Sequence, residues 1–143
     1  MLDFTSLSKA IAQLETSLRY ARSEAAKADG DLFRQFRSAS IQAFEFTYEL
    51  SWKSLKRYLE ATSADAQSVD ALSFPDLIRT AAEAGLLASN WDVWKDFRYA
   101  RSVTSHTYDA GKADEVFAIA GHFLAEAKEL QRRLEKAQGH APE

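Results

Sequence analysis

The chain has 143 residues with five glycines, two prolines and no cysteine, so one domain can bury its core, and disulfides, zinc fingers and a thiolate nucleophile are excluded. Its net charge of -3 excludes a whole-molecule positive field for nucleic acid, and any contact with RNA must come from a local patch. No segment has the length of a membrane span and the N-terminus lacks the apolar core of a signal peptide, so we expect a cytoplasmic protein.

Two long helices are predicted for the first half of the chain. Apolar residues recur in steps of three and four from Leu7, which is the spacing of one helical face, and Gly30 is expected to end this helix. A second helix is predicted from Asp31 to the polar run 62–70, with a length of about 45 Å. The stripes that should face the core are Leu7, Ile11, Leu14, Leu18, Ala21 and Ala25, then Phe33, Phe36, Ile41, Phe44, Tyr48, Trp52, Leu55 and Leu59.

A short third helix and a long last helix are predicted in the second half. Ser73, followed three residues later by Asp76, is typical of a capped helix start, and Gly85 is typical of a helix end. The last helix has a heptad-like stripe and precedes a tail, 139–143, that is expected to fray. Its apolar positions are Val116, Ala120, Phe123, Ala127, Leu130 and Leu134.

A fourth helix is predicted between these two. Asn90 can cap its start, and the helix should run through Arg101. The β-branched and serine-rich stretch 102–107 is expected to fray, and 108–112 should turn the chain into the last helix.

Five amphipathic helices without a strand pattern predict an all-α fold, in which an up-and-down bundle over residues 1–138 buries the apolar stripes as one domain. The second helix also carries Phe46 and Leu50 off its main stripe, with Tyr58 further along. Because apolar residues on a second face usually contact another chain, we expect a homodimer or a permanent partner.

Two other features favour a structural interpretation. Trp52, Trp91 and Trp94 fall on apolar stripes, which indicates core or interface positions rather than base stacking. The acidic triplet 29–31 lies at a helix junction without a preceding strand and turn, so we expect no metal there. Nothing else in the sequence calls for a metal or a cofactor.

The segment 99–109, YARSVTSHTYD, carries the strongest chemical signal in the chain. Arg101 can bind a phosphate through two parallel N–H bonds, and His106 can move a proton near neutral pH. Without further context such a pattern often arises by chance, and both side chains could simply bind carbonyl groups at a helix C-terminus. Arg98 either adds to a phosphate-binding patch or forms a salt bridge with a neighbouring carboxylate.

Cleavage of RNA without a metal needs a base, an acid and a cation, and one copy of this chain supplies only part of that set. His122 is predicted on an outward face of the last helix and His140 lies in the tail, so neither is well placed to assist His106. Two-fold symmetry would bring a second His106 and a second Arg101 to the same site. The chemistry therefore favours a dimer.

Two segments resemble a known family. The stretches 41–60, IQAFEFTYELSWKSLKRYLE, and 98–109, RYARSVTSHTYD, resemble the substrate-binding subunit that accompanies minimal nucleotidyltransferases in two-gene operons. This branch of the HEPN superfamily is also described as the HepT toxin family. The resemblance covers nearly the whole chain and implies a dimeric helical bundle with the Arg-x4-His motif near the dimer axis.

The resemblance also implies roles for single residues. Arg101 and His106 would be the catalytic pair of a metal-independent ribonuclease, and Tyr108 would be the tyrosine to which a nucleotidyltransferase adds AMP to silence the toxin. A tyrosine in a turn otherwise usually packs its ring and keeps its hydroxyl in water. The chain departs from the family at Ser102, where many members have asparagine, and this shortens a polar group expected near the phosphate.

Two questions stay open at this point, the role of the glutamates and the role of the whole protein. Glu45, Glu49 and Lys53 either form a solvated ladder of helix pairs or, at the dimer axis, the two glutamates orient Arg101. The whole protein is either a ribonuclease toxin or a non-catalytic subunit that presents substrate or nucleotide to the transferase. A purely structural dimerisation module is a third possibility.

Overall fold

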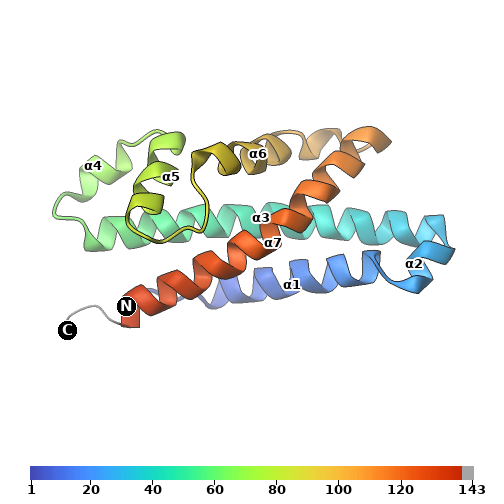
Figure 1. Ribbon diagram of the computed structural model, residues 1–143, viewed down its shortest axis with the longest axis horizontal. Helices are drawn as coiled ribbons and strands as arrows, with labels where there is room; N and C mark the ends of the chain where they lie inside the picture. Colours follow the sequence, from blue (N-terminus) through green and yellow to red (C-terminus); the bar gives the residue numbers. More distant parts are fainter. Residues whose placement is uncertain (140–143) are drawn as a thin grey trace.

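The computed structural model describes residues 1–139, and this part of the chain contains helices joined by short connections and no strand (Figure 1). The all-α prediction is therefore confirmed, while the dimer stays a prediction. In chain order the elements are α1 (Thr5–Ala21), α2 (Glu24–Ala28), α3 (Gly30–Thr62), α4 (Ala66–Asp70), α5 (Phe74–Glu83), α6 (Trp91–Ser102), the 3-10 turn η1 (Thr104–His106) and α7 (Ala110–Gly139).

The long helix α3 organises the bundle (Figure 1). Helix α1 packs along one side of α3, α7 crosses both, and α5 and α6 lie on the side of α3 away from α1. The first residues are tied to the end of α7, because the Leu2 amide donates to Gln138 Oε1 at 2.8 Å and Gln138 Nε2 donates to the Leu2 carbonyl at 2.9 Å. The two ends of the described chain therefore meet.

The predicted stripes form the core. Every predicted position of the last helix is fully buried, and those of the first helix are buried as far as Ala21. In α3 the buried stripe consists of Ile41, Phe44, Tyr48, Leu55 and Leu59, while the two phenylalanines near its start and Trp52 are partly buried. An aromatic cluster lies at the centre of this core, in which Trp94 and Phe123 meet edge to face with ring centres 5.6 Å apart.

The first predicted helix is wrong in its second half, because the chain breaks into α1 and α2. The Ser23 hydroxyl donates to the Tyr20 carbonyl at 2.6 Å and accepts from the Ala26 amide at 3.2 Å, which ends one helix and caps the next. The spacing of apolar residues does not reveal a serine side chain that bonds to the backbone in this way. The break also shifts the register, so that Ala26 is buried and Ala25, the predicted core residue, is exposed.

The remaining boundaries follow the capping residues. The predicted caps at Ser73 and Asn90 are confirmed, with side-chain oxygens 3.3 and 2.7 Å from the amides that they accept from. The polar run 62–70 is not wholly a loop, since Asp65 caps the short helix α4. The turn expected over 108–112 is shorter than predicted, because Asp109 Oδ1 accepts from the Lys112 amide at 3.1 Å and α7 starts at Ala110. Of the expected frayed tail, 140–143 lie outside the described residues.

The structure also shows how exposed the other apolar residues singled out in the sequence are. Phe46 is 57% exposed, whereas Leu50 and Tyr58 are half-buried. Trp94 is a core residue, as predicted, but Trp91 lies only at the edge of the core. Within residues 1–139, no helix combines the length and the apolar character needed to cross a membrane.

Candidate phosphate-binding site at the end of α6

Arg101 lies in the last turn of α6 and reaches back to α3. Its Nε donates to Glu49 Oε1 at 3.3 Å, and its Nη1 is 3.8 Å from Glu45 Oε2. The Arg101 side chain is about two-fifths exposed, so it contacts carboxylates on one side and is open to solvent on the other. The structure thus brings together three of the predicted site residues from two helices.

Thr104 completes the support of Arg101, and the sequence reasoning missed it. Its hydroxyl donates to the Arg101 carbonyl at 2.9 Å and accepts from Arg101 Nη1 at 3.1 Å. Thr104 is only 8% exposed and starts the turn η1. The available signal was its position three residues after Arg101, where a threonine hydroxyl commonly returns to a helix carbonyl. Of the three guanidinium nitrogens of Arg101, Nη2 alone has no hydrogen-bond partner among the described residues, which leaves it for a ligand.

Glu49 joins the arginine to its surroundings. Its Oε2 accepts from Trp52 Nε1 at 3.2 Å and lies 3.7 Å from Lys53 Nζ, while its Oε1 binds Arg101. Glu49 therefore pairs both with Lys53, as the ladder interpretation predicts, and with Arg101, as the orienting interpretation predicts. Whether the glutamates also lie at a dimer axis stays a prediction.

His106 ends η1 and is exposed. The turn is held by its backbone, because the His106 amide donates to the Val103 carbonyl at 3.0 Å and the Asp109 amide donates to the His106 carbonyl at 3.2 Å. No described residue bonds to the imidazole. Its ring nitrogens are therefore accessible from solvent.

Tyr108 projects into solvent beside His106. It is 86% exposed, and the two ring centres are 6.1 Å apart in an edge-on arrangement. The usual role of a turn tyrosine, with its ring packed against the protein, does not apply here. The hydroxyl is therefore accessible to a modifying enzyme.

The other two predicted residues behave differently from each other. The Ser102 hydroxyl donates to the Tyr99 carbonyl at 2.6 Å, so it is directed to its own helix rather than to Arg101. The Arg98 guanidinium lies 5.0 Å from the centre of the Phe74 ring, and no carboxylate of residues 1–139 lies within ion-pair distance of it. The expected salt bridge of Arg98 is therefore absent from the described part of the chain, and its charge stays available.

Two groups near the site have shifted pKa values. Burial raises the pKa of the Tyr48 hydroxyl, which lies beneath the site, so that tyrosine stays neutral. Lys112 Nζ donates to the Tyr99 hydroxyl at 3.2 Å, and this bond, with the nearby Glu115, raises the pKa of the lysine. Lys112 therefore remains a cation close to the segment that carries His106.

The two aspartates of the acidic triplet 29–31 cap and pair with the first turns of α3. Asp29 Oδ1 accepts from the amides of Asp31 and Leu32 as the cap of α3, and Asp31 pairs with Arg34. Among residues 1–139, no group of three or more His, Asp and Glu side chains lies close enough together to hold a metal ion.

The fold and the site together define an all-α bundle with an arginine at the end of α6 and a histidine on the segment that links α6 to α7. The chain belongs to the family of nucleotidyltransferase substrate binding protein-like proteins, whose family model matches residues 2–136. It is 31% identical to a solved structure from Haemophilus influenzae that is described as the fold of a substrate-binding domain of a nucleotidyltransferase. That comparison covers 93% of this chain and 99% of the other, with a TM-score of 0.87.

A curated relative from the same species is named probable ribonuclease HepT. It is 39% identical over 97 residues, a match that covers 68% of this chain and 66% of the relative. The chain therefore spans slightly less than two thirds of the length of that relative.

Proposed function

We propose that this protein is the helical partner of a small nucleotidyltransferase in a two-gene toxin–antitoxin module, and that it acts as a metal-independent ribonuclease. The observation that carries the proposal is a partly exposed Arg101, held by Glu49 and Thr104, five residues before the exposed His106. The family match and the ribonuclease name of the relative support it.

The chemistry requires each group to have one role. A base removes the proton of a ribose 2′-hydroxyl, the 2′-oxygen attacks the adjacent phosphorus, and the 5′-oxygen leaves with a proton from an acid. His106 is the proton carrier, and Arg101 stabilises the charge that gathers on the phosphate oxygens. The products are a 2′,3′-cyclic phosphate and a free 5′-hydroxyl.

A symmetric homodimer would complete this set. One chain supplies one suitable histidine, because His122 is exposed on α7 and lines a hollow with Asp96 and Phe97 whose lining includes neither Arg101 nor His106. A second copy would supply the second His106. The exposed Phe46, next to Glu45 on α3, supports a contact between copies beside the site.

Tyr108 is the proposed point of control. In the modification, the tyrosine oxygen attacks the α-phosphorus of ATP, AMP is transferred to the tyrosine and pyrophosphate leaves. The exposed hydroxyl makes this reaction sterically possible. An anionic phosphate and a nucleoside next to the His106 ring would then block the approach of RNA.

Cleavage of labelled RNA by the purified protein tests the ribonuclease. We expect cleavage by the wild type and a loss of at least about 100-fold in Arg101→Ala and His106→Ala, because each removes a group that acts in the transition state. His122→Ala is the matched control and should cleave normally. Intact RNA with the wild type, or equal activity in all variants, would refute the ribonuclease.

A non-catalytic binding subunit is the second candidate. The Ser102 hydroxyl, which is turned to Tyr99 rather than to Arg101, favours it, as does the substrate-binding description of the family. In that case the wild type binds RNA or nucleotide without cutting it, and Arg101→Ala weakens binding only.

The modification has a separate test. Incubation with the transferase encoded nearby and ATP should add the mass of AMP to a peptide that contains Tyr108, and Tyr108→Phe should stay unmodified. Tyr20→Phe is the control, since Tyr20 is also exposed but lies on α1. An unmodified wild-type peptide would rule out this mode of control.

A further inference from the structure

Helix α6 separates its charges into two sides. At about 100° per residue, Trp91, Lys95, Arg98 and Arg101 fall within about a third of the helix circumference. This side faces α3 and α5, since Arg101 binds carboxylates of α3 and Arg98 stacks on Phe74 of α5. Asp96 lies on the other side, where it lines a hollow with residues of α7. One edge of α6 is therefore basic.

Two of these cations are not neutralised by the protein. Arg98 and Lys95 are exposed, and no carboxylate of residues 1–139 comes within 4.0 Å of either. Arg101, in contrast, is shared with two glutamates. The Arg98 guanidinium carbon lies 5.0 Å from the centre of the Phe74 ring, and this cation–π contact leaves its N–H groups available to a phosphate.

A row of partly exposed aromatic rings runs beside this basic edge. The ring centres of Trp52 and Phe74 are 6.0 Å apart, as are those of Phe74 and Trp91, and all three side chains are half-buried. Glu49 joins the row to the candidate site, because it binds both Trp52 and Arg101. The row thus leads from the candidate site to the start of α6.

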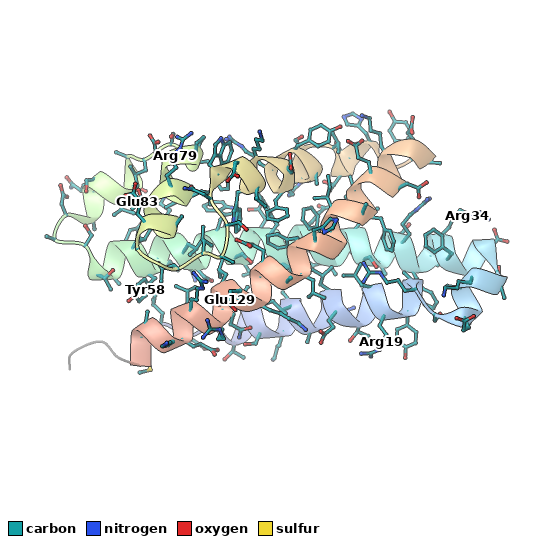
Figure 2. The ribbon with its side chains drawn as sticks, viewed as in Figure 1. Arg19, Arg34, Tyr58, Arg79, Glu83 and Glu129 are labelled. Carbon is teal, nitrogen blue, oxygen red and sulfur yellow. The ribbon has the colours of Figure 1, made fainter. Side chains whose placement is uncertain are left out.

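The row ends at a hollow of about 470 Å³. Trp91 forms part of its wall, and its other lining residues include the cations Lys95 and Arg79 together with Asn90. Arg79 projects from α5 beside the start of α6 (Figure 2). Asp92 also lines the hollow, in the first turn of α6 where a carboxylate interacts favourably with the helix dipole. An aromatic wall next to cations suits a base with its phosphate.

We propose that this edge of α6 binds single-stranded RNA next to the phosphate at Arg101, with backbone phosphates on Arg98 and Lys95 and a base stacked on Trp91. The path rests on the ribonuclease function proposed above, because it takes Arg101 as the position of the cleaved phosphate. Trp91 and Arg101 are ten residues apart, or about 15 Å along the helix, which a short run of nucleotides can follow. Unpaired bases are needed, since a duplex would hide the faces that stack.

The test measures affinity separately from cleavage. The probe is a fluorescent single-stranded oligoribonucleotide whose 2′-hydroxyl groups are methylated, so that it cannot be cut. In Lys95→Gln/Arg98→Gln, we expect the slope of log affinity against log salt to fall by about 1.4, or about 0.7 for each lost phosphate contact. The matched control is Lys9→Gln/Lys136→Gln, which removes two exposed cations away from α6 and should leave the slope unchanged.

A second pair of variants tests the base. Trp91→Leu should weaken binding by about 5- to 100-fold, whereas Trp91→Phe should keep most of the affinity because it keeps an aromatic face. Thermal unfolding of both variants checks that the packing against Phe74 survives. Equal affinities of the leucine and phenylalanine variants would remove Trp91 from the path.

Several results would overturn the path. The first is an unchanged salt slope in Lys95→Gln/Arg98→Gln. The second is an affinity of the wild type for AMP alone, or for duplex RNA, equal to its affinity for the single-stranded probe. The third is a Lys95→Gln/Arg98→Gln variant that binds RNA normally but no longer binds the transferase. The last would assign this surface to the protein partner. If the wild type binds the probe through α6 but leaves unmethylated RNA intact, the ribonuclease fails and the path stands. If the wild type and Lys95→Gln/Arg98→Gln cleave RNA with the same KM, the path fails and the ribonuclease stands.

Discussion

Arg101, the phosphate ligand of the proposed function, is held in place by its neighbours. Glu49 and Thr104 take the Nε and Nη1 groups, and Glu45 lies close enough to add its charge. The bonds reduce the rotational freedom that the arginine would otherwise lose on binding a phosphate. The cost is a partly neutralised charge, and the unpaired Arg98 compensates for it one turn earlier on α6.

Thr104→Val tests this preparation. The variant keeps the shape of the side chain but removes the acceptor for Arg101 Nη1, so we expect RNA cleavage to fall by about 10- to 100-fold, as for a misplaced catalytic group. The free energy of unfolding should fall by only about 1 kcal/mol for the lost hydroxyl.

Thr104→Ser is the control, because it keeps the hydroxyl and should restore most of the cleavage. Equal cleavage by the valine and serine variants, measured in the same assay together with urea unfolding, would contradict a positioning role for Thr104.

At the scale of the elements, α7 holds the α5–α6 connection and the start of α6. Glu126 is 6% exposed, and its carboxylate accepts from the amide and the hydroxyl of Ser89, both at 3.1 Å, and from Trp94 Nε1 at 2.9 Å. Two turns later, Arg133 donates to the carbonyls of Gly85 and Leu87 at 3.2 and 2.7 Å. These contacts set where α6 begins and thus the direction in which Arg101 points.

Glu126→Ala should lower the free energy of unfolding by about 2–4 kcal/mol, because it leaves the buried N–H of Trp94 and the partly buried N–H of Ser89 without an acceptor. Glu126→Gln keeps one carbonyl oxygen in this position and should lose less. Urea unfolding of the two variants measures the difference, and a loss below about 0.5 kcal/mol in Glu126→Ala would contradict this role.

Glu129 gives a pH-dependent prediction for the same connection. Hydrogen bonds from Arg132 and Arg133 lower the pKa of this carboxyl to about 2. A folded-state pKa below the unfolded value stabilises the protein above the unfolded pKa, and the effect disappears as the pH falls toward the folded pKa. The stability difference between the wild type and Glu129→Gln should therefore be constant above about pH 5 and shrink from about pH 4.5 to 2.

Urea unfolding of both proteins across this pH range measures that difference. Figure 2 shows Glu129 on α7 beside the α5–α6 connection. A difference that does not change with pH would mean that the pairing with the two arginines is lost in solution.

At the scale of the whole molecule, α3 has two functions. One face buries Phe44, Tyr48 and Leu55 in the core, and an adjoining face carries Glu45 and Glu49 with the exposed Phe46. An exposed phenylalanine next to charged groups that bind Arg101 is a reason to expect contact with a second copy. The candidate site would then lie at the junction of two bundles.

Phe46→Ser should convert a dimer to a monomer in light scattering and abolish RNA cleavage, because each site would lose the partner's groups. Helicity by circular dichroism should not change, since Phe46 contributes little to the core. Val93→Ser, which alters another exposed apolar residue on α6, is the control. A wild-type monomer, or a dimer that survives Phe46→Ser, would contradict this interface.

The sequence predicted the helices and the core well where periodicity and capping agree. The stripe of α7, the caps at Ser73 and Asn90 and the buried face of α3 all follow from residues within one or two turns of each other. It failed at Ser23, where one hydroxyl bonds to both flanking helices, and over 62–70, where Asp65 caps a helix too short to show a period. These are local effects that a hydrophobic pattern averages away.

For the candidate site, residue type and spacing along the chain indicated Arg101 and His106, and the family resemblance added Tyr108. The sequence left the role of Glu49 open, missed Thr104, and favoured a core or interface position for Trp91 over base stacking. Only the tertiary structure shows the contacts that these residues make. Glu49 and Arg101 are 52 positions apart, so their pairing depends on how α6 crosses α3, and this crossing is set by the packing of the whole core and by no single segment.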